Sequence, residues 1–91
     1  MDKIDVTFTT VLQKVNEKGG WTYAVWPEAA EFFGTKGAVK VSGTVNGHPV
    51  DSSFMPMGGG VQMLPIKADI RKAIGKEAGD TVTIRLLERR S

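Results

Sequence analysis

The fold is decided by two ten-residue stretches, VWPEAAEFFG at residues 25–34 and IKADIRKAIG at residues 66–75. Each follows a run of residues that favour strands, carries an acid near its start and ends on a glycine. In both stretches apolar residues recur at the spacing i, i+3, i+4, which is typical of a short helix packed on a core. The chain therefore repeats one strand–helix unit, and this repeat predicts a fold rather than a chemistry.

The composition is that of one ordinary soluble domain. The chain has 91 residues, of which 41% are hydrophobic and 24% are charged, and a domain of this size buries roughly 60–65% of its unfolded surface. It contains no cysteine, which excludes disulfides, thiol nucleophiles and thiolate metal sites. The charged start, MDKID, does not look like a signal peptide, and no apolar run approaches the roughly 18–20 residues of a membrane span. We therefore expect a cytoplasmic protein without membrane contact.

Alternating residues and turn signals predict six strands and two helices. The strands are expected at residues 5–15, 21–25, 39–45, 48–54, 61–66 and 81–87, and the helices at 27–33 and 67–74. A turn at 16–20 joins the first two strands, and Asn46-Gly47 is the strongest hairpin signal in the chain. Residues 55–60, MPMGGG, are expected to form a loop.

The resulting order is β-β-α-β, an Asn-Gly turn, and β-β-α-β again. Each half, residues 3–45 and 48–88, is too small to close a core, so we expect the two halves to pack about a pseudo-twofold axis in one domain, 1–91. The predicted fold class is mainly β (α+β), a small six-stranded double-split β-barrel with two short helices and a β-β-α-β internal repeat. The helix residues predicted to lie in its core are Phe32, Phe33, Ile70 and Ile74.

Several motifs, in this order along the chain, resemble those of a known family. They are GAVKVSGTVNG at 37–47, MPMGGG at 55–60 and GDTV at 79–82. Together they are similar to a small bacterial double-split-barrel family, catalogued as a domain of unknown function and often joined to a YdeI/OmpD-associated domain. The strand–helix–GD–strand order of residues 66–84 also resembles, more distantly, the AbrB-like swapped-hairpin barrels. The resemblance implies a monomeric barrel and supplies no catalytic residue.

The glycine-rich loop is the first candidate site. Its three glycines would let a ligand approach backbone N–H groups, but the loop lacks the Lys-Ser/Thr of a phosphate-binding loop and precedes a strand. The alternative interpretation is a hairpin loop that needs unusual φ angles. The candidate set for an apolar pocket with a few polar groups is Trp26, Ser52, Ser53, Met55, Met57, Gly58, Gly59, Gly60 and Gln62. We expect its ligand to be a small molecule or a peptide.

Large aromatic residues flank the second predicted strand. Trp21 and Tyr23 share one face of that strand, and Trp26 points to the other. Such residues in a small barrel are mostly core, although one of them at the mouth of the barrel would stack on a flat ligand. Trp26 is expected to be the exposed one because it lies at the strand-to-helix junction.

The sequence favours neither a metal site nor an enzyme. Met55, Met57 and Met63 with His48 suggest a soft-metal site, but one histidine and no cysteine favour methionines that fill the core or its rim. His48 has no carboxylate at a spacing that would orient it as an acid or base. We therefore expect a binding domain with no catalytic residues, no metal and no cofactor.

An uneven charge distribution supports a nucleic-acid alternative. The net charge is +2, but residues 1–64 carry five lysines against six acids, while residues 65–91 carry seven lysines and arginines against four acids. This pattern is typical of a solvated helix face and a charged tail. The residues that would carry nucleic-acid binding are Lys67, Arg71, Lys72, Arg89 and Arg90.

Overall fold

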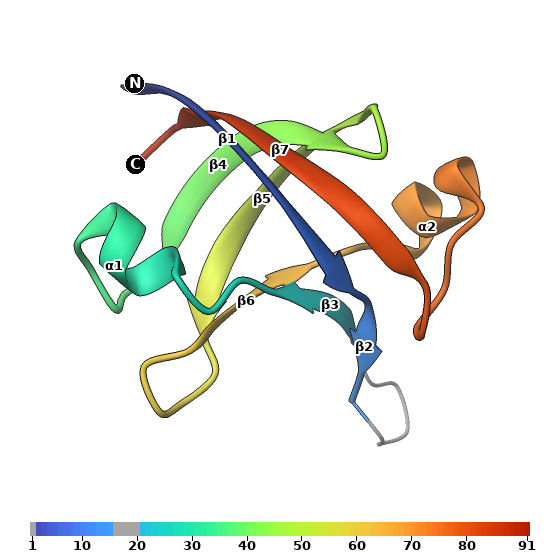
Figure 1. Cartoon of the computed structure of the whole chain (residues 1–91), viewed down its shortest axis with the longest axis horizontal. Helices are drawn as coiled ribbons and strands as arrows, with labels where there is room; N and C mark the ends of the chain where they lie inside the picture. The colour runs from blue at the N-terminus through green and yellow to red at the C-terminus, as the bar shows by residue number, and fades with distance from the viewer. Residues whose placement is uncertain (1, 16–20) are drawn as a thin grey trace.

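One curled, antiparallel sheet forms most of the molecule, and it brings the two ends of the chain together (Figure 1). The computed structural model describes residues 2–15 and 21–91, so the turn predicted at 16–20 lies outside the described residues. The strands are β1 (Asp2–Val11), β2 (Gln13–Lys14), β3 (Thr22–Val25), β4 (Val39–Val45), β5 (His48–Pro56), β6 (Gln62–Pro65) and β7 (Thr81–Arg89), and the helices are α1 (Ala29–Phe33) and α2 (Ala68–Ile74). The strand order is β1-β7-β4-β5-β6-β3-β2. The fold is therefore mainly β, a half-barrel sheet with two short helices.

The described residues contain seven strands rather than the predicted six, because the first strand breaks at Leu12. The N–H of Leu12 donates to the carbonyl oxygen of Asp80 at 2.9 Å, and its own carbonyl oxygen accepts from the N–H of Gly79 at 2.8 Å. Before this residue β1 pairs with β7, and after it β2 pairs with β3. The two ends of the sheet order are therefore consecutive in the chain.

The turns follow the sequence signals closely. Asn46 and Gly47 both have positive φ, 48° and 82°, as a two-residue hairpin between right-twisted strands requires. Gly58, Gly59 and Gly60 also have positive φ, which confirms the prediction of unusual backbone angles there. However, β5 continues to Pro56, so Met55 and Pro56 belong to a strand and not to the predicted loop.

The core lies inside the curl of the sheet and includes one of the two adjacent α1 phenylalanines. Phe33 is buried, whereas Phe32 is 46% exposed, so the prediction of a buried Phe32 was wrong. Neighbouring positions of a helix point about 100° apart, and the face of α1 that buries Phe33 leaves Phe32 turned partly toward solvent. Ile70 and Ile74 of α2 are partly buried and pack against the core. The large side chains that are fully buried in this core include Leu12, Phe54, Leu64, Ile84 and Leu86.

Candidate functional site

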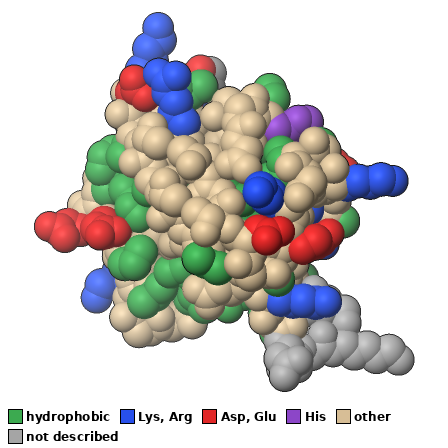
Figure 2. All heavy atoms as spheres, turned by 45° about the vertical axis from the view of Figure 1, so that its right-hand side comes forward, with side chains coloured by type: hydrophobic (Ala, Val, Ile, Leu, Met, Phe, Trp, Pro, Cys, Tyr) green, Lys and Arg blue, Asp and Glu red, His purple; other side chains and the backbone are tan. Residues whose placement is uncertain are grey.

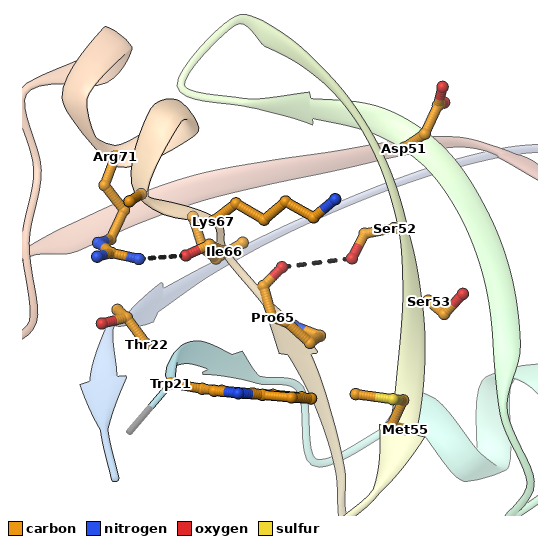
Figure 3. A pocket seen from close by; sticks show the side chains of 11 residues that line it. Trp21, Thr22, Asp51, Ser52, Ser53, Met55, Pro65, Ile66, Lys67 and Arg71 are labelled. Atoms are coloured by element: carbon orange, nitrogen blue, oxygen red, sulfur yellow. Dashed lines mark hydrogen bonds between the residues drawn. The ribbon is translucent and has the colours of Figure 1, made fainter. Parts of the chain in front are cut away.

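A pocket of about 560 Å³ opens beside the start of α2 (Figure 3). Its wall is made by residues 21–22 before and in β3, by 51–53 and 55 of β5, and by 65–68 and 71 at the end of β6 and in α2. This volume lies within the range of about 300–1,000 Å³ that is typical of small-ligand sites. Three segments far apart in the sequence therefore enclose one space of suitable size.

The pocket exists because β5 and β6 separate. The two strands pair only at Met55–Met63 and Pro56–Gln62. Continuing this register would place Pro65 opposite Ser53, but proline has no N–H to donate to a neighbouring strand. Beyond Pro65 the chain turns into α2. The Ser52 hydroxyl still donates to the carbonyl oxygen of Pro65 at 3.3 Å, so a side chain spans the gap where the backbone ladder has stopped.

One wall of the pocket is apolar. The indole of Trp21 is 51% exposed, and Figure 3 shows Trp21 and Met55 pointing toward one another along the lower edge of the pocket. Pro65, Ile66 and Ala68 continue this surface toward α2. An exposed tryptophan beside a methionine offers a ligand a flat aromatic face and a polarisable, adaptable neighbour.

Positive charge lies on the opposite side. The Nη1 of Arg71 donates to the carbonyl oxygen of Ile66 at 2.6 Å, and its Nε donates to Glu77 Oε1 at 3.0 Å, so protein groups already hold this guanidinium. Lys67 instead extends across the pocket toward β5 (Figure 3), and its ammonium group has no hydrogen bond or ion pair with the part of the chain that the structure describes.

The acid that lines the pocket, Asp51, already has other partners. Asp51 accepts a hydrogen bond from the Ser42 hydroxyl at 2.7 Å and lies 3.7 Å from Arg90. Its carboxylate points away from the pocket (Figure 3). Of the two cations that line the pocket, Arg71 is held by Ile66 and Glu77, and Lys67 is the one that extends across it.

The structure brings together only some of the candidate ligand residues. Ser52, Ser53 and Met55 line the pocket. Trp26 does not, because it is only 7% exposed and stacks on Phe8 with ring centroids 4.8 Å apart. The prediction that Trp26 would be the exposed tryptophan was therefore wrong, and Trp21 takes that place.

The remaining candidates lie elsewhere. Gln62 is 1% exposed, and its Nε2 donates to the carbonyl oxygens of Thr35 and Gly37 at 3.0 and 3.1 Å. It thus fastens the segment between α1 and β4 to β6. Met57 and the three glycines, residues 57–60, form the exposed tip of the β5–β6 hairpin and do not line the pocket.

The five residues of the nucleic-acid alternative do not form one surface. Lys67, Arg71 and Lys72 belong to the start and middle of α2, whereas Arg89 and Arg90 lie at the far end of β7, beside α1 (Figure 1). Arg89 donates from Nη1 to the carbonyl oxygen of Phe33 at 3.1 Å. On the face shown in Figure 2, basic and acidic side chains are interspersed.

The described residues offer few other sites. Over residues 2–15 and 21–91 no group of three or more His, Asp or Glu side chains could hold a metal ion. Within the same ranges no helix has the length and apolar character needed to cross a membrane.

The fold and the pocket together define a small, mainly β domain with an open, ligand-sized hollow. The chain belongs to the family described as Domain of unknown function (DUF1905), whose model matches residues 8–86. The match confirms the family resemblance drawn from the motifs. No curated protein matches the chain.

Proposed function

We propose that this domain is a non-catalytic binding module, and that it binds a peptide or small molecule in the pocket between β5 and α2 rather than at the glycine-rich loop. The observation that carries the proposal is the combination of an exposed Trp21, an adjacent Met55 and the ammonium group of Lys67 around one space of about 560 Å³. An apolar wall with one or two polar groups that orient the ligand is the usual construction of a binding site.

We further propose that the fold is a double-split barrel with an internal twofold relation, six-stranded when β1 and β2 are counted as one strand broken at Leu12, and that it acts as a monomer because one chain supplies both halves. The pairing pattern supports this. The segment β1–β2 pairs with β3 of its own half and with β7 of the other, and β5 pairs with β6 of its own half and with β4 of the other. Exchanging the halves leaves this pattern unchanged. The equivalent strands β3 and β6 also pair with each other, as do β4 and β7.

Details at the two strand-to-helix junctions support the same relation. The Thr10 hydroxyl donates to the carbonyl oxygen of Val25 at 3.1 Å, as the Ser52 hydroxyl does to Pro65. Both helices then end with the same pair of backbone hydrogen bonds, formed by the N–H groups of residues 34 and 35 in α1 and of 75 and 76 in α2.

The two junctions differ in what fills them. In the first half Phe8 stacks on Trp26, beside a hollow of about 450 Å³. The corresponding residues of the second half are smaller. Val50 takes the place of Phe8, since it pairs with Gly43 of β4 as Phe8 pairs with Ile84 of β7. Ile66 takes the place of Trp26, since each is the first residue after its strand, β6 or β3. One junction thus carries an aromatic stack, and the other carries the larger pocket. This difference favours the second junction as the binding site.

The probe that tests this proposal is 8-anilinonaphthalene-1-sulfonate, an apolar anion whose fluorescence rises in apolar sites. We expect saturable binding to the folded domain that is weakened by Trp21→Ala and by Met55→Ser. Met57→Ser is the matched control, because Met57 is 43% exposed and lies outside the pocket. Equal loss of binding in Met55→Ser and Met57→Ser, or no binding to the folded domain, would contradict the proposal.

A further inference from the structure

We propose that the pocket between β5 and α2 binds a small planar aromatic acid, with its ring against Trp21 and Met55 and its carboxylate at Lys67. This inference rests on the proposed function and names its ligand class. It combines three observations: a half-exposed indole, an ammonium group that no described residue holds, and the opposite charge at the corresponding hollow of the other half.

The aromatic part of the ligand follows from the exposed indole. Trp21 is 51% exposed and lines the pocket together with Met55, and the two side chains point toward one another in Figure 3. A planar ring that stacks on an indole gains free energy beyond the apolar area it covers, and a thioether favours the edge of an aromatic ring. This side of the pocket therefore favours a flat aromatic ligand over an aliphatic one.

The acidic part of the ligand follows from Lys67. Its side chain is exposed and extends across the pocket (Figure 3), and its ammonium group has no hydrogen bond or ion pair with any residue of 2–15 or 21–91. Arg71 and Asp51, which also line the pocket, are already paired with Glu77 and Arg90, respectively. A carboxylate in the pocket would therefore meet Lys67 without displacing an acid of the described chain from it.

The other half of the chain has a corresponding hollow with the opposite charge, the space of about 450 Å³ beside Trp26. The second residue after β6 is Lys67, whereas the second residue after β3 is Pro27. The third residue is Ala68 after β6 and Glu28 after β3. All four residues line their respective hollows, and the charged residue that lines the smaller hollow is the acid. The smaller hollow therefore disfavours a carboxylate, while the pocket favours one.

A compact molecule fits this arrangement better than a chain segment inserted between the strands. The carbonyl oxygen of Pro65 lies 3.3 Å from the Ser52 hydroxyl, so the protein itself fills the space beside β5 at this point. Trp21 and Lys67 lie on opposite sides of Pro65 in Figure 3. A small molecule lying against Pro65 can therefore present its ring to the indole and its carboxylate to the ammonium group.

The first test uses 2-naphthylacetate and the indole N–H signals of the ¹⁵N-labelled protein. The two signals, assigned with Trp21→Phe, report on the two hollows separately, because Trp21 lines the pocket and Trp26 lines the smaller hollow. We expect a saturable shift of the Trp21 signal and little change at Trp26. A larger shift at Trp26, or equal shifts at both, would overturn the inference.

The aromatic requirement is tested with the saturated analogue, decahydronaphthalene-2-acetate, which has the same carboxylate but no flat ring. It should bind about fivefold or more weakly than 2-naphthylacetate, because it cannot stack on the indole. Equal affinities of the two acids would show that the pocket does not select a planar ring, and would contradict the proposed ligand class.

The charge requirement is tested with 2-naphthylacetamide, which keeps the ring and loses the charge. The amide should bind about fivefold or more weakly than the acid. Lys67→Met should remove this difference by weakening the acid alone, and Lys67→Arg should retain it. Lys72→Met is the matched control, because it removes the same charge from the exposed surface of α2 outside the pocket, and acid binding should stay within about twofold. Acid binding that is unchanged in Lys67→Met would overturn the inference.

The failure of this inference is distinguishable from that of the proposed function. Equal binding of the acid and the amide, with both weakened by Trp21→Ala, would refute the aromatic-acid class and leave the proposed binding site standing. Absence of binding by every naphthalene probe, the anilinonaphthalene sulfonate included, would refute the two together.

Discussion

The hydroxyl of Ser52 donates a hydrogen bond to the carbonyl oxygen of Pro65 at 3.3 Å. This bond joins β5 to β6 beyond Met55–Met63, the last backbone pair of the two strands on the side of α2. Thr10 and Val25 make the corresponding contact in the first half of the chain at 3.1 Å. In each half a side-chain hydroxyl bridges strands at a strand-to-helix junction. The bridge at Ser52 holds β5 and the end of β6 together in the wall of the pocket.

Ser52→Ala should therefore destabilise the domain by about 0.5–1.5 kcal/mol, which is the net contribution of an ordinary hydrogen bond. The measurement is the free energy of unfolding from urea titration. Ser53→Ala is the matched control, because the described residues give the Ser53 hydroxyl no hydrogen-bond partner and the change should stay within about 0.5 kcal/mol. Equal losses for the two variants would argue against a structural role for the bridge.

Gly43 is the position at which the sheet tolerates no side chain. It lies at the register shift between β4 and β7, and a Cβ atom there would overlap the carbonyl oxygen of Arg85 and approach Leu86 Cα to 3.0 Å. Because the obstacle is backbone, Gly43→Ala should cost at least about 1–3 kcal/mol. Gly37→Ala is the control, since its Cβ would meet Thr35 Oγ1 at an ordinary 3.5 Å. Unfolding midpoints that are equal for the two variants would contradict this reading.

Much of the fold could be predicted from local signals. The Asn46-Gly47 turn requires positive φ at both residues, and both have it. Both predicted helices form and stop at Gly34 and Gly75, although α1 begins at Ala29, two residues after its predicted start. The break at Leu12 could not be predicted, because it depends on hydrogen bonds to Gly79 and Asp80, almost seventy residues away. Nothing in the alternation of the first strand marks a long-range contact of this kind.

The site was less predictable. Ser52, Ser53 and Met55, which the sequence singled out, line the pocket, whereas the glycines singled out with them lie outside it, at the tip of the β5–β6 hairpin. Trp21 was missed because exposure depends on which strands pair, not on its position beside a turn. Pro65 was the available signal: a proline at the end of a strand cannot donate to a neighbour, so it marks the point where pairing stops and a gap opens.

Phe33 and Phe32 give a direct test of the core. Phe33 is buried against Trp26 and Phe54, with ring centroids 6.0 and 5.7 Å away, whereas Phe32 is 46% exposed. Phe33→Ala should cost about 3–5 kcal/mol. Phe32→Ala should cost only about 1 kcal/mol, from lost contact with the Trp26 and Phe33 rings. Denaturant midpoints measure both, and a larger loss at Phe32 would reverse the assignment of the buried face of α1.

The ion pair between Asp5 and Arg85 should act only above acidic pH. The Arg85 guanidinium donates to both carboxylate oxygens, at 2.9 and 3.1 Å, and its hydrogen bonds and charge lower the pKa of Asp5. Stability from this pair is therefore present above the unfolded pKa of about 3.9 and is lost as the pH falls through the lower folded value. Because both groups are exposed, the effect is small.

Asp5→Asn should accordingly lower the melting temperature slightly near neutral pH, and the difference from the native chain should shrink as the pH falls below about 3.9. Thermal unfolding followed by circular dichroism across this range measures it. Glu88→Gln controls for the loss of one acidic charge, because the described residues give Glu88 no ion pair. A difference that grows on acidification would contradict the sign of the pKa shift.

The two tryptophans should be distinguishable by their fluorescence. Trp21 is half exposed at the pocket, whereas Trp26 is enclosed by Phe8, Phe33 and Phe54. In the native chain acrylamide should quench one fraction of the emission strongly and another weakly.

Trp21→Phe should remove the strongly quenched fraction and shift the remaining emission to the blue, because the remaining indole lies in an apolar core. Trp26→Phe should leave a red-shifted, readily quenched emission, provided that far-ultraviolet circular dichroism shows the variant folded. Strong quenching that persists in Trp21→Phe would mean that Trp26, and not Trp21, faces solvent, and it would remove the aromatic wall on which the binding proposal depends.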